Sequence, residues 1–387
     1  MYLHHRPAPR RLAALCAVCI GTVAGLAACG STSSSSTSAS ASTQLAAASA
    51  STTSASTTSG TGKPVHLAME LIVTGLPFEA ETQAGAEAAA KQFGATLNVS
   101  APTTFDPATA ISQVSSAISQ GANGVAIADE PASLWTRALT NASTQTHGNT
   151  VTFNAVPAAG TVKTYVGNND LALGQVLAAA TIKAAHLSPG TTGQVIISNC
   201  NPTSSPLAVT VKGLVQTVHQ LLPKATVEPP FNSQITPSAN FTAWRQEISA
   251  HPSAVLALGS CDQDGDSMIK AKQAASGKFA IGATDLDPLV LQGIANGTVA
   301  AALAQDWYVE GYTAIRLLIN SVRNGTPPPA GWIQPGTVTV TKANVAQLEA
   351  RDASAAGMAG FYKPIIAKLW GTTSPATQPL SAAQAIG

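Results

Sequence analysis

From residue 63 onward, short apolar runs alternate with longer segments in which apolar residues recur at helical spacing. The runs predict strands, and the segments between them predict helices. The first series gives strands at 65–73, 96–99, 124–128 and 150–154, and helices at 81–93, 107–120 and 132–144. Strands that alternate with helices through short Gly- and Asn-rich turns favour parallel βαβ units.

The same alternation begins again near residue 171. It predicts helices at 171–186, 207–222, 242–251, 264–276 and 287–294, and strands at 194–198, 227–231, 254–258, 279–283 and 299–304. Two such rounds predict two similar lobes. Ligands of open α/β sheets bind beyond the carboxyl ends of the strands, so we expect a cleft between the lobes. Asp285 and Gln305 each end a predicted strand and are expected to face it.

The C-terminal part of the chain predicts a helix at 308–324 and a strand at 338–340. Residues 346–370 then carry an apolar stripe at helical spacing, formed by Phe361, Ile365, Leu369 and Trp370. A stripe of this kind is more often core than a binding surface. We therefore expect this helical extension, 346–387, to pack on one lobe.

The N-terminus has the pattern of an export signal. An apolar run at 12–26, too short to span a membrane comfortably, follows three arginines, Arg6, Arg10 and Arg11. The run ends in Leu26-Ala27-Ala28-Cys29, which resembles the bacterial lipobox, in which the cysteine receives a lipid before cleavage. We expect a signal peptide at 1–28 and a lipid on Cys29. The alternative is an ordinary signal peptide with an incidental cysteine.

Residues 29–62 are almost entirely Ser, Thr and Ala. This composition cannot bury enough apolar surface to fold, and as a flexible tether it would reach about 30 Å. The anchor and the tether together predict a domain held on the extracytoplasmic side of the cell membrane, close to the bilayer but free to move.

Composition narrows the function classes. Charged residues make up 10% of the 387 residues and the formal net charge is +1, so the basic footprint of a nucleic-acid-binding protein is missing. The sequence has no Gly-x-Ser-x-Gly, His-Glu-x-x-His or Gly-x-Gly-x-x-Gly motif. We therefore expect no catalytic residues, no metal and no organic cofactor.

Several short motifs follow one another in an order typical of a known family. They are Gly85-Ala86-Glu87-Ala88-Ala89-Ala90, Asp106-Pro107, Ser119-Gln120-Gly121-Ala122-Asn123-Gly124-Val125, Val166-Gly167-Asn168-Asn169, Gly282 to Pro288, and Ala304-Gln305-Asp306-Trp307-Tyr308-Val309-Glu310-Gly311-Tyr312. Together they resemble the type I periplasmic sugar-binding proteins of ABC importers, over roughly residues 63–342. The resemblance implies an α/β fold of two Rossmann-like parallel-sheet lobes joined by three hinge crossings.

The implied crossings fall near 168–169, near 305–306 and around 331–335. The N-terminal lobe is then 63–168 with 306–331, and the C-terminal lobe is 169–305 with 332–345. A transcription regulator with the same ligand fold would need a helix-turn-helix before the first lobe, where this chain has the lipobox and the tether.

The resemblance also implies ligand contacts. Gln305 matches a sugar-contacting residue, and Phe78 matches an aromatic that covers the apolar face of a sugar ring. A second aromatic of that turn is replaced by Glu79, and Asn154 stands where relatives often have Asp-Arg. Phe231 and Trp307 are candidate walls of the site.

Carboxylates complete the candidate set. Asp285 can accept hydrogen bonds from neighbouring hydroxyls, and Asp262 either contacts ligand or caps the helix that follows it. Asp129, with Glu130, follows a strand at the rim of the cleft, where solvation alone explains them equally well. Because these candidates include no cation, a carboxylate or phosphate ligand is disfavoured. A neutral sugar or polyol is the leading expectation, and a small cationic solute is its rival.

Two cysteines remain after export, since Cys16 and Cys19 leave with the signal. Cys200 and Cys261 end the first and third strands of the second lobe, which are neighbours in the strand order that the resemblance implies. Adjacent strands lie ~4.8 Å apart, a spacing that a disulfide tolerates. We therefore expect a Cys200–Cys261 disulfide beneath the cleft.

The function implied is a solute-binding lipoprotein of an ABC transporter, a monomer that closes on its ligand and docks on a membrane permease coupled to a separate ATPase. A ligand sensor for a membrane signalling partner uses the same fold and stays open as an alternative.

Overall fold

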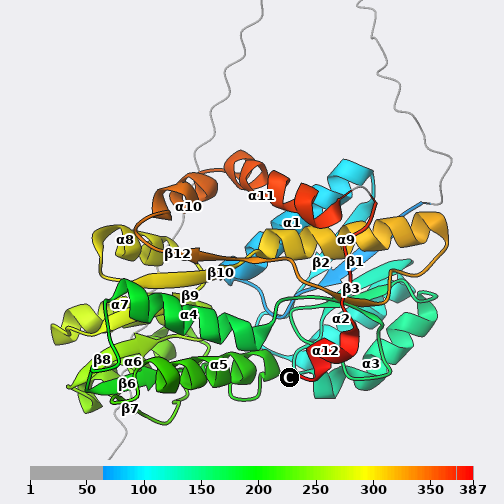
Figure 1. The fold of residues 1–387 in the computed structure, drawn as a ribbon. Coiled ribbons are helices and arrows are strands. Elements are labelled where there is room, and N and C mark those ends of the chain that lie inside the picture. Colours follow the sequence, from blue (N-terminus) through cyan, green and yellow to red (C-terminus); the bar gives the residue numbers. More distant parts are fainter. Residues whose placement is uncertain (1–63, 372, 387) are drawn as a thin grey trace, which may run out of the picture. The chain divides into compact units, whose positions relative to one another are not determined.

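Two six-stranded sheets organise the computed structural model, which describes residues 64–371 and 373–386 (Figure 1). The predicted signal peptide, the lipid site at Cys29 and the tether lie outside the described residues. Each sheet carries its own set of helices, and the two sets define the first and the second lobe. The predicted two-lobed α/β fold is confirmed.

The first sheet has the order β11-β5-β4-β3-β1-β2, and all its pairs are parallel. Its strands are β1 (His66–Glu70), β2 (Thr96–Ser100), β3 (Gly124–Ala128), β4 (Thr150–Phe153), β5 (Thr164–Val166) and β11 (Gly331–Ile333). The helices of the first lobe are α1 (Pro77–Phe93), α2 (Pro107–Ser119), α3 (Ala132–Gln145) and α9 (Trp307–Asn324).

The second sheet has the order β12-β10-β9-β8-β6-β7, with only β12 antiparallel to its neighbour. Its strands are β6 (Gln194–Ile197), β7 (Thr226–Val227), β8 (Ala254–Leu258), β9 (Ala280–Thr284), β10 (Ala301–Gln305) and β12 (Thr337–Val340). The helices of the second lobe are α4 (Asp170–Ala184), α5 (Ser205–Leu221), α6 (Pro237–Ala250), α7 (Asp262–Ala275) and α8 (Pro288–Asn296).

Prolines set the starts of several helices earlier than the apolar pattern predicts. Helix α1 begins at Pro77 rather than at residue 81, and α6 begins at Pro237 rather than at 242. The fixed φ of proline suits the first helical turn, where its missing N–H costs nothing. In both helices the apolar stripe begins after the first helical turn, so it underestimates helix length.

Two short strands and one boundary differ from the prediction. β5 and β11 were not predicted, and they pair with each other at the edge of the first sheet. Trp332 and Ile333 therefore belong to the first lobe, so the boundary predicted between 331 and 332 is too early. β7 covers only two residues of its strand, although Phe231 still forms an isolated bridge with Ser198.

The three chain crossings between the lobes meet at Asn168. Its amide nitrogen donates to Oε1 of Gln305 at 3.1 Å, and its Oδ1 accepts from the backbone N–H of Gly336 at 3.2 Å. The N–H of Asp306 in turn donates to the carbonyl of Gly336 at 3.0 Å. One side chain thus joins the crossings that follow β5, β10 and β11, and we call this cluster the hinge.

The C-terminal extension differs from the single helix expected. It forms α10 (Val345–Asp352), α11 (Ala355–Trp370) and α12 (Leu380–Gln384). The break occurs because Ser354 caps α11, its hydroxyl accepting from the N–H of Gly357 at 3.0 Å. α10 contacts α8 of the second lobe, whereas α11 contacts α9 of the first (Figure 1). The expectation that the extension packs on one lobe is therefore wrong.

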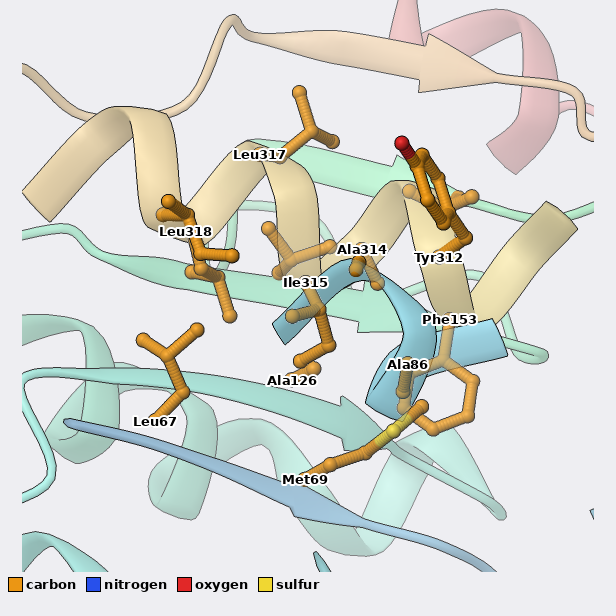
Figure 2. Close-up of a cluster of buried hydrophobic side chains, with 14 of the residues drawn as sticks. Leu67, Met69, Ala86, Ala126, Phe153, Tyr312, Ala314, Ile315, Leu317 and Leu318 are labelled. Carbon is orange, nitrogen blue, oxygen red and sulfur yellow. The ribbon is translucent and has the colours of Figure 1, made fainter. Parts of the chain in front are cut away.

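The core of the first lobe lies between its sheet and the helices α1 and α9 (Figure 2). Leu67 and Met69 of β1 and Phe153 of β4 face Ala86 of α1 and Ile315 of α9, all of them buried. Small residues let the two helices approach closely. A Cβ on Gly85 would lie 1.9 Å from the carbonyl oxygen of Tyr308, so α1 and α9 are in backbone contact there.

We expect Gly85→Ala to destabilise the protein by about 2–3 kcal/mol, since the added methyl group forces α1 and α9 apart. The better helix propensity of alanine, about 1 kcal/mol, opposes this loss without cancelling it. Urea unfolding followed by circular dichroism measures the change. Gly360→Ala in α11 is the matched control, because nothing lies within 4 Å of its added Cβ. Equal stability of the two variants would contradict the close approach.

Candidate functional site

A cavity of about 110 Å³ lies between the lobes at the carboxyl ends of both sheets. The residues that follow β3, β4, β9 and β10 reach it, as do those that follow β6 and β8. We call it the interlobe cavity. Its position agrees with the cleft predicted from the strand–helix alternation, and it is the right place for a ligand in folds of this class.

Most of the predicted ligand residues line the interlobe cavity. They are Phe78, Asn154, Asp262, Asp285, Gln305 and Trp307. Phe78 and Trp307 form an aromatic pair with ring centroids 4.9 Å apart. Phe78 lies at the start of α1 and Trp307 at the start of α9, so close packing of these two helices brings the rings together.

Asp285 is held by Trp307. The indole N–H of Trp307 donates to Oδ1 of Asp285 at 2.8 Å. Asp285 has a φ of 62°, in the left-handed region that a non-glycine residue seldom adopts, and strained backbone of this kind clusters at functional sites. Burial raises the pKa of its carboxyl to about 7, against the opposing hydrogen bond from Trp307.

Gln305 connects the cavity with the hinge. Its Oε1 accepts the hydrogen bond from Asn168, so any contact of Gln305 with a ligand falls to its amide N–H groups. Asn154 also has a left-handed φ, 65°, and its side-chain amide donates to Glu130 at 3.3 Å. Amides of the first lobe and of the hinge thus border the same space as Asp285.

Three of the proposed ligand residues do not line the cavity. Glu79 is buried and accepts a hydrogen bond from the N–H of Ile72 at 2.8 Å, so it ties α1 to the end of β1. Asp129 is fully buried, and burial raises the pKa of its carboxyl well above the usual range. Phe231 packs edge-on against Trp244 in the second lobe, with ring centroids 4.9 Å apart.

The alternatives at two positions can now be separated. Glu130 lines the interlobe cavity, whereas Asp129 does not, and both are buried, so a solvated rim describes neither residue. Capping of α7 is carried out by Asp264, whose Oδ2 accepts from the N–H of Cys261 at 3.0 Å. Asp262, which could have been that cap, instead lines the cavity.

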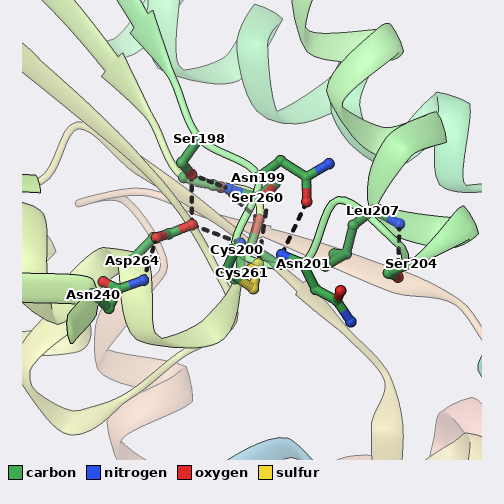
Figure 3. Close-up of a disulfide and its surroundings, with 12 residues drawn as sticks. Ser198, Asn199, Cys200, Asn201, Ser204, Leu207, Asn240, Ser260, Cys261 and Asp264 are labelled. Atoms are coloured by element: carbon green, nitrogen blue, oxygen red, sulfur yellow. Dashed lines mark hydrogen bonds between the residues drawn. A yellow bond between two sulfur atoms is a disulfide. The ribbon is translucent and has the colours of Figure 1, made fainter. Parts of the chain in front are cut away.

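The predicted disulfide is present beneath the cavity. Cys200 and Cys261 are joined with a Cα–Cα distance of 6.2 Å, and both line the cavity (Figure 3). Near the disulfide, the buried carboxylate of Asp264 accepts hydrogen bonds from Ser198 and Asn240 (Figure 3). It also accepts one from the indole N–H of Trp244. This network fixes the start of α7 and therefore the position of Asp262.

Sequence reasoning missed some of the lining. Phe105, Asp170 and Asn201 border the cavity but were not predicted. Asp170 opens α4 directly after the crossing at Asn168, and Phe105 precedes the helix start at Asp106-Pro107. Attention to the residues beside these two motifs would have identified both positions.

A second, wider cavity of about 710 Å³ adjoins the first. It shares Phe78, Asp262, Asp285 and Trp307 with the interlobe cavity and extends to Arg351 in α10. The C-terminal extension thus borders the space on the outer side of the aromatic pair.

Within residues 64–371 and 373–386, no group of three or more His, Cys, Asp or Glu side chains is arranged to hold a metal ion. Over the same residues, no helix is both long enough and apolar enough to cross a membrane.

Solved structures share this fold at low sequence identity. GanP, a glucose-galactose binding protein from Geobacillus stearothermophilus, is similar at 19% identity with a TM-score of 0.64, over 73% of this chain and 99% of GanP. An ABC transporter solute binding protein from Burkholderia graminis, in complex with D-arabinose, is 20% identical with a TM-score of 0.67, over 73% of this chain and 97% of its own. The XylFII–LytSN complex is similar at 19% identity with a TM-score of 0.64, over 73% of this chain and 99% of the matched chain.

At these identities the likeness concerns the fold alone. Among curated proteins, none matches this sequence. The family model described as "Periplasmic binding protein domain", however, matches residues 68–326, which span the interlobe cavity, the disulfide and two of the three crossings. The chain therefore belongs to the periplasmic binding protein domain family.

Proposed function

We propose that this protein captures a sugar or polyol in the interlobe cavity and delivers it to the permease of an ABC importer. The observation that carries the proposal is the meeting of an aromatic pair, Phe78 and Trp307, with the hydrogen-bonding groups of Asp285 and Gln305 in one cavity. Aromatic faces cover the apolar C–H surface of a sugar ring, while carboxylates and amides bind its hydroxyls. Similar structures named for glucose, galactose and arabinose support this assignment.

Capture would proceed by closure about the hinge. A ligand that contacts Phe78 of the first lobe and Asp285 of the second favours the conformation in which the two lie close together. Because Gln305 contacts both the cavity and Asn168, it gives the ligand a direct contact with the crossings. The carboxylates act as binding groups in this proposal, and no bond is made or broken.

We propose further that lipidated Cys29 and the tether hold the protein at the extracytoplasmic face of the cell membrane as a monomer. There it would meet the permease, whose cytoplasmic ATPase drives uptake. The signal-like N-terminus and the Ser/Thr/Ala segment support this placement. Mass spectrometry of membranes from a producing strain would detect a diacylglyceryl group on Cys29, and an unmodified, secreted chain would contradict it.

A thermal-shift screen tests the capture of a sugar. Arabinose, glucose, galactose and myo-inositol are added to the full chain in detergent, and the true ligand at a hundredfold excess over its Kd should raise the unfolding midpoint by about 5 °C. Phe78→Ala should weaken that ligand about tenfold or more, which corresponds to ~1.4 kcal/mol. Leu134→Ala is the control, because Leu134 in α3 is 61% exposed and outside the cavity. Equal affinity of Phe78→Ala and Leu134→Ala would remove the aromatic pair from the site.

Ligand sensing is the second candidate, and the similar XylFII–LytSN complex favours it, since that structure pairs such a fold with a second protein. Uptake of the labelled ligand by a deletion strain separates the two functions. Lost uptake supports import, whereas unchanged uptake with a lost transcriptional response supports sensing.

A further inference from the structure

The carboxyl group of Asp262, in the wall of the interlobe cavity, receives no hydrogen bond from an amide, hydroxyl or cationic group of the described residues. Asp262 is 5% exposed, and the neighbour of its carboxylate oxygens is instead the carboxyl of Asp287. Buried polar groups are almost always paired, so an orphan of this kind calls for a specific explanation. The capping role that would account for it belongs to Asp264.

The groups around Asp262 are acidic as well. Burial raises the pKa of the Asp262 carboxyl well above the usual range, and the negative charges of Asp285 and Asp287 raise it further. Glu130 and Asp170 line the same cavity. Of the described residues that line it, none is Lys, Arg or His; the cation Arg351 lines only the second cavity.

Aromatic rings stand beside this acidic group. Phe78 and Trp307 line both cavities together with Asp262 and Asp285. The indole N–H of Trp307 is occupied by Asp285, so what Trp307 presents to a ligand is ring surface. Ring faces attract cations, and the attraction is strongest where water is excluded.

We propose that the ligand of the interlobe cavity carries a positively charged nitrogen, which lies against Asp262 and Asp285 and contacts the rings of Phe78 and Trp307. An ammonium group supplies the donors that the orphaned oxygens of Asp262 lack. An organic ammonium fits better than a metal ion, because the described residues offer no cluster of three metal-ligating side chains. The inference rests on the proposed function and narrows its ligand class to an amino sugar or an aminated polyol.

Pairs of ligands that differ at one group, charged in one member and neutral in the other, test this inference on the full chain in detergent. D-glucosamine is compared with D-glucose, and choline with its neutral carbon analogue 3,3-dimethylbutan-1-ol, by isothermal titration calorimetry. The charged member of at least one pair should bind at least about tenfold more tightly than its neutral partner. This comparison needs no variant, so a folding defect cannot obscure it.

Asp262→Asn should reduce the charge preference to about twofold or less, since the amide keeps the shape and loses the charge. Glu87→Gln is the control and should leave the preference intact. Glu87 is an exposed carboxylate of α1 that lines neither cavity. Unfolding midpoints of both variants without ligand establish that they are folded.

The outcomes separate this inference from the proposed function. If neutral sugars bind and their amino counterparts bind no better, the charged ligand is excluded and sugar capture stands. If the charge preference persists in Asp262→Asn, Asp262 is not its source and the inference is overturned. Binding of neither sugars nor amines would contradict both proposals.

Discussion

Replacing both Cys200 and Cys261 by serine is expected to lower the free energy of unfolding by about 4 kcal/mol, because the disulfide closes a long loop in the unfolded chain. The two cysteines are separated by 61 positions in the sequence. Serine is close to cysteine in size, and at Cys261, the N-cap of α7, it is the better capping residue. Urea unfolding of the wild type and the double variant measures the loss.

The same double variant should bind ligand more weakly, since both cysteines line the interlobe cavity and connect the loops after β6 and β8. Reductant provides the control: it should lower the unfolding midpoint of the wild type to that of the double variant and leave the variant unchanged. A wild type whose unfolding does not respond to full reduction would show that the cross-link contributes nothing to stability.

The second large effect is expected for Asp264→Ala, at about 4 kcal/mol. This carboxylate is fully buried and accepts from the Ser198 hydroxyl at 2.6 Å, the Trp244 indole at 2.7 Å and the Asn240 amide at 2.9 Å. Removing it leaves the Ser198 hydroxyl and the Trp244 indole buried without an acceptor, while the Asn240 amide keeps its bond to the carbonyl of Gln234. Hydrogen bonds to charged groups contribute about 1.5–3 kcal/mol each. Neighbouring losses in one network are not additive, which keeps the total below the sum.

Asp264→Asn should fall between the wild type and Asp264→Ala, because one amide oxygen remains to accept while the NH₂ group faces other donors. Glu349→Ala removes an exposed carboxylate from α10 and should change stability by less than about 0.5 kcal/mol. The three variants are compared by urea unfolding. A loss for Asp264→Ala no larger than that for Glu349→Ala would mean that the network does not hold the second lobe together.

The fold could be predicted because its periodicities are long and its turns are marked. The strands that the sequence did not predict are short and have no such periodicity. β5 reads Thr-Tyr-Val and β11 reads Gly-Trp-Ile, three residues each, too short for a period to show. They form only because residues 165 positions apart in the chain, such as Gly167 and Trp332, meet and share a 2.7 Å hydrogen bond.

Prediction of the candidate site likewise succeeded for some residues and failed for others. Strand ends placed Asp285 and Gln305 at the cavity, since the carboxyl ends of neighbouring parallel strands meet at one edge. The sequence pattern does not show which of two adjacent residues at an element's end lines the cavity. Glu130 lines the cavity while Asp129 beside it is buried, and Phe78 lines it while Glu79 returns to the end of β1.

Besides the three chain crossings, the C-terminal helices connect the two lobes through non-covalent contacts. Arg351 in α10, which contacts α8 of the second lobe, lies 3.6 Å from Glu81 of α1 in the first and donates to the hydroxyl of Tyr362 in α11 at 2.8 Å. Any rotation that separates the lobes must lengthen or break these contacts of Arg351. The lobes are therefore joined at two separate places, at the hinge and at this contact of the C-terminal helices.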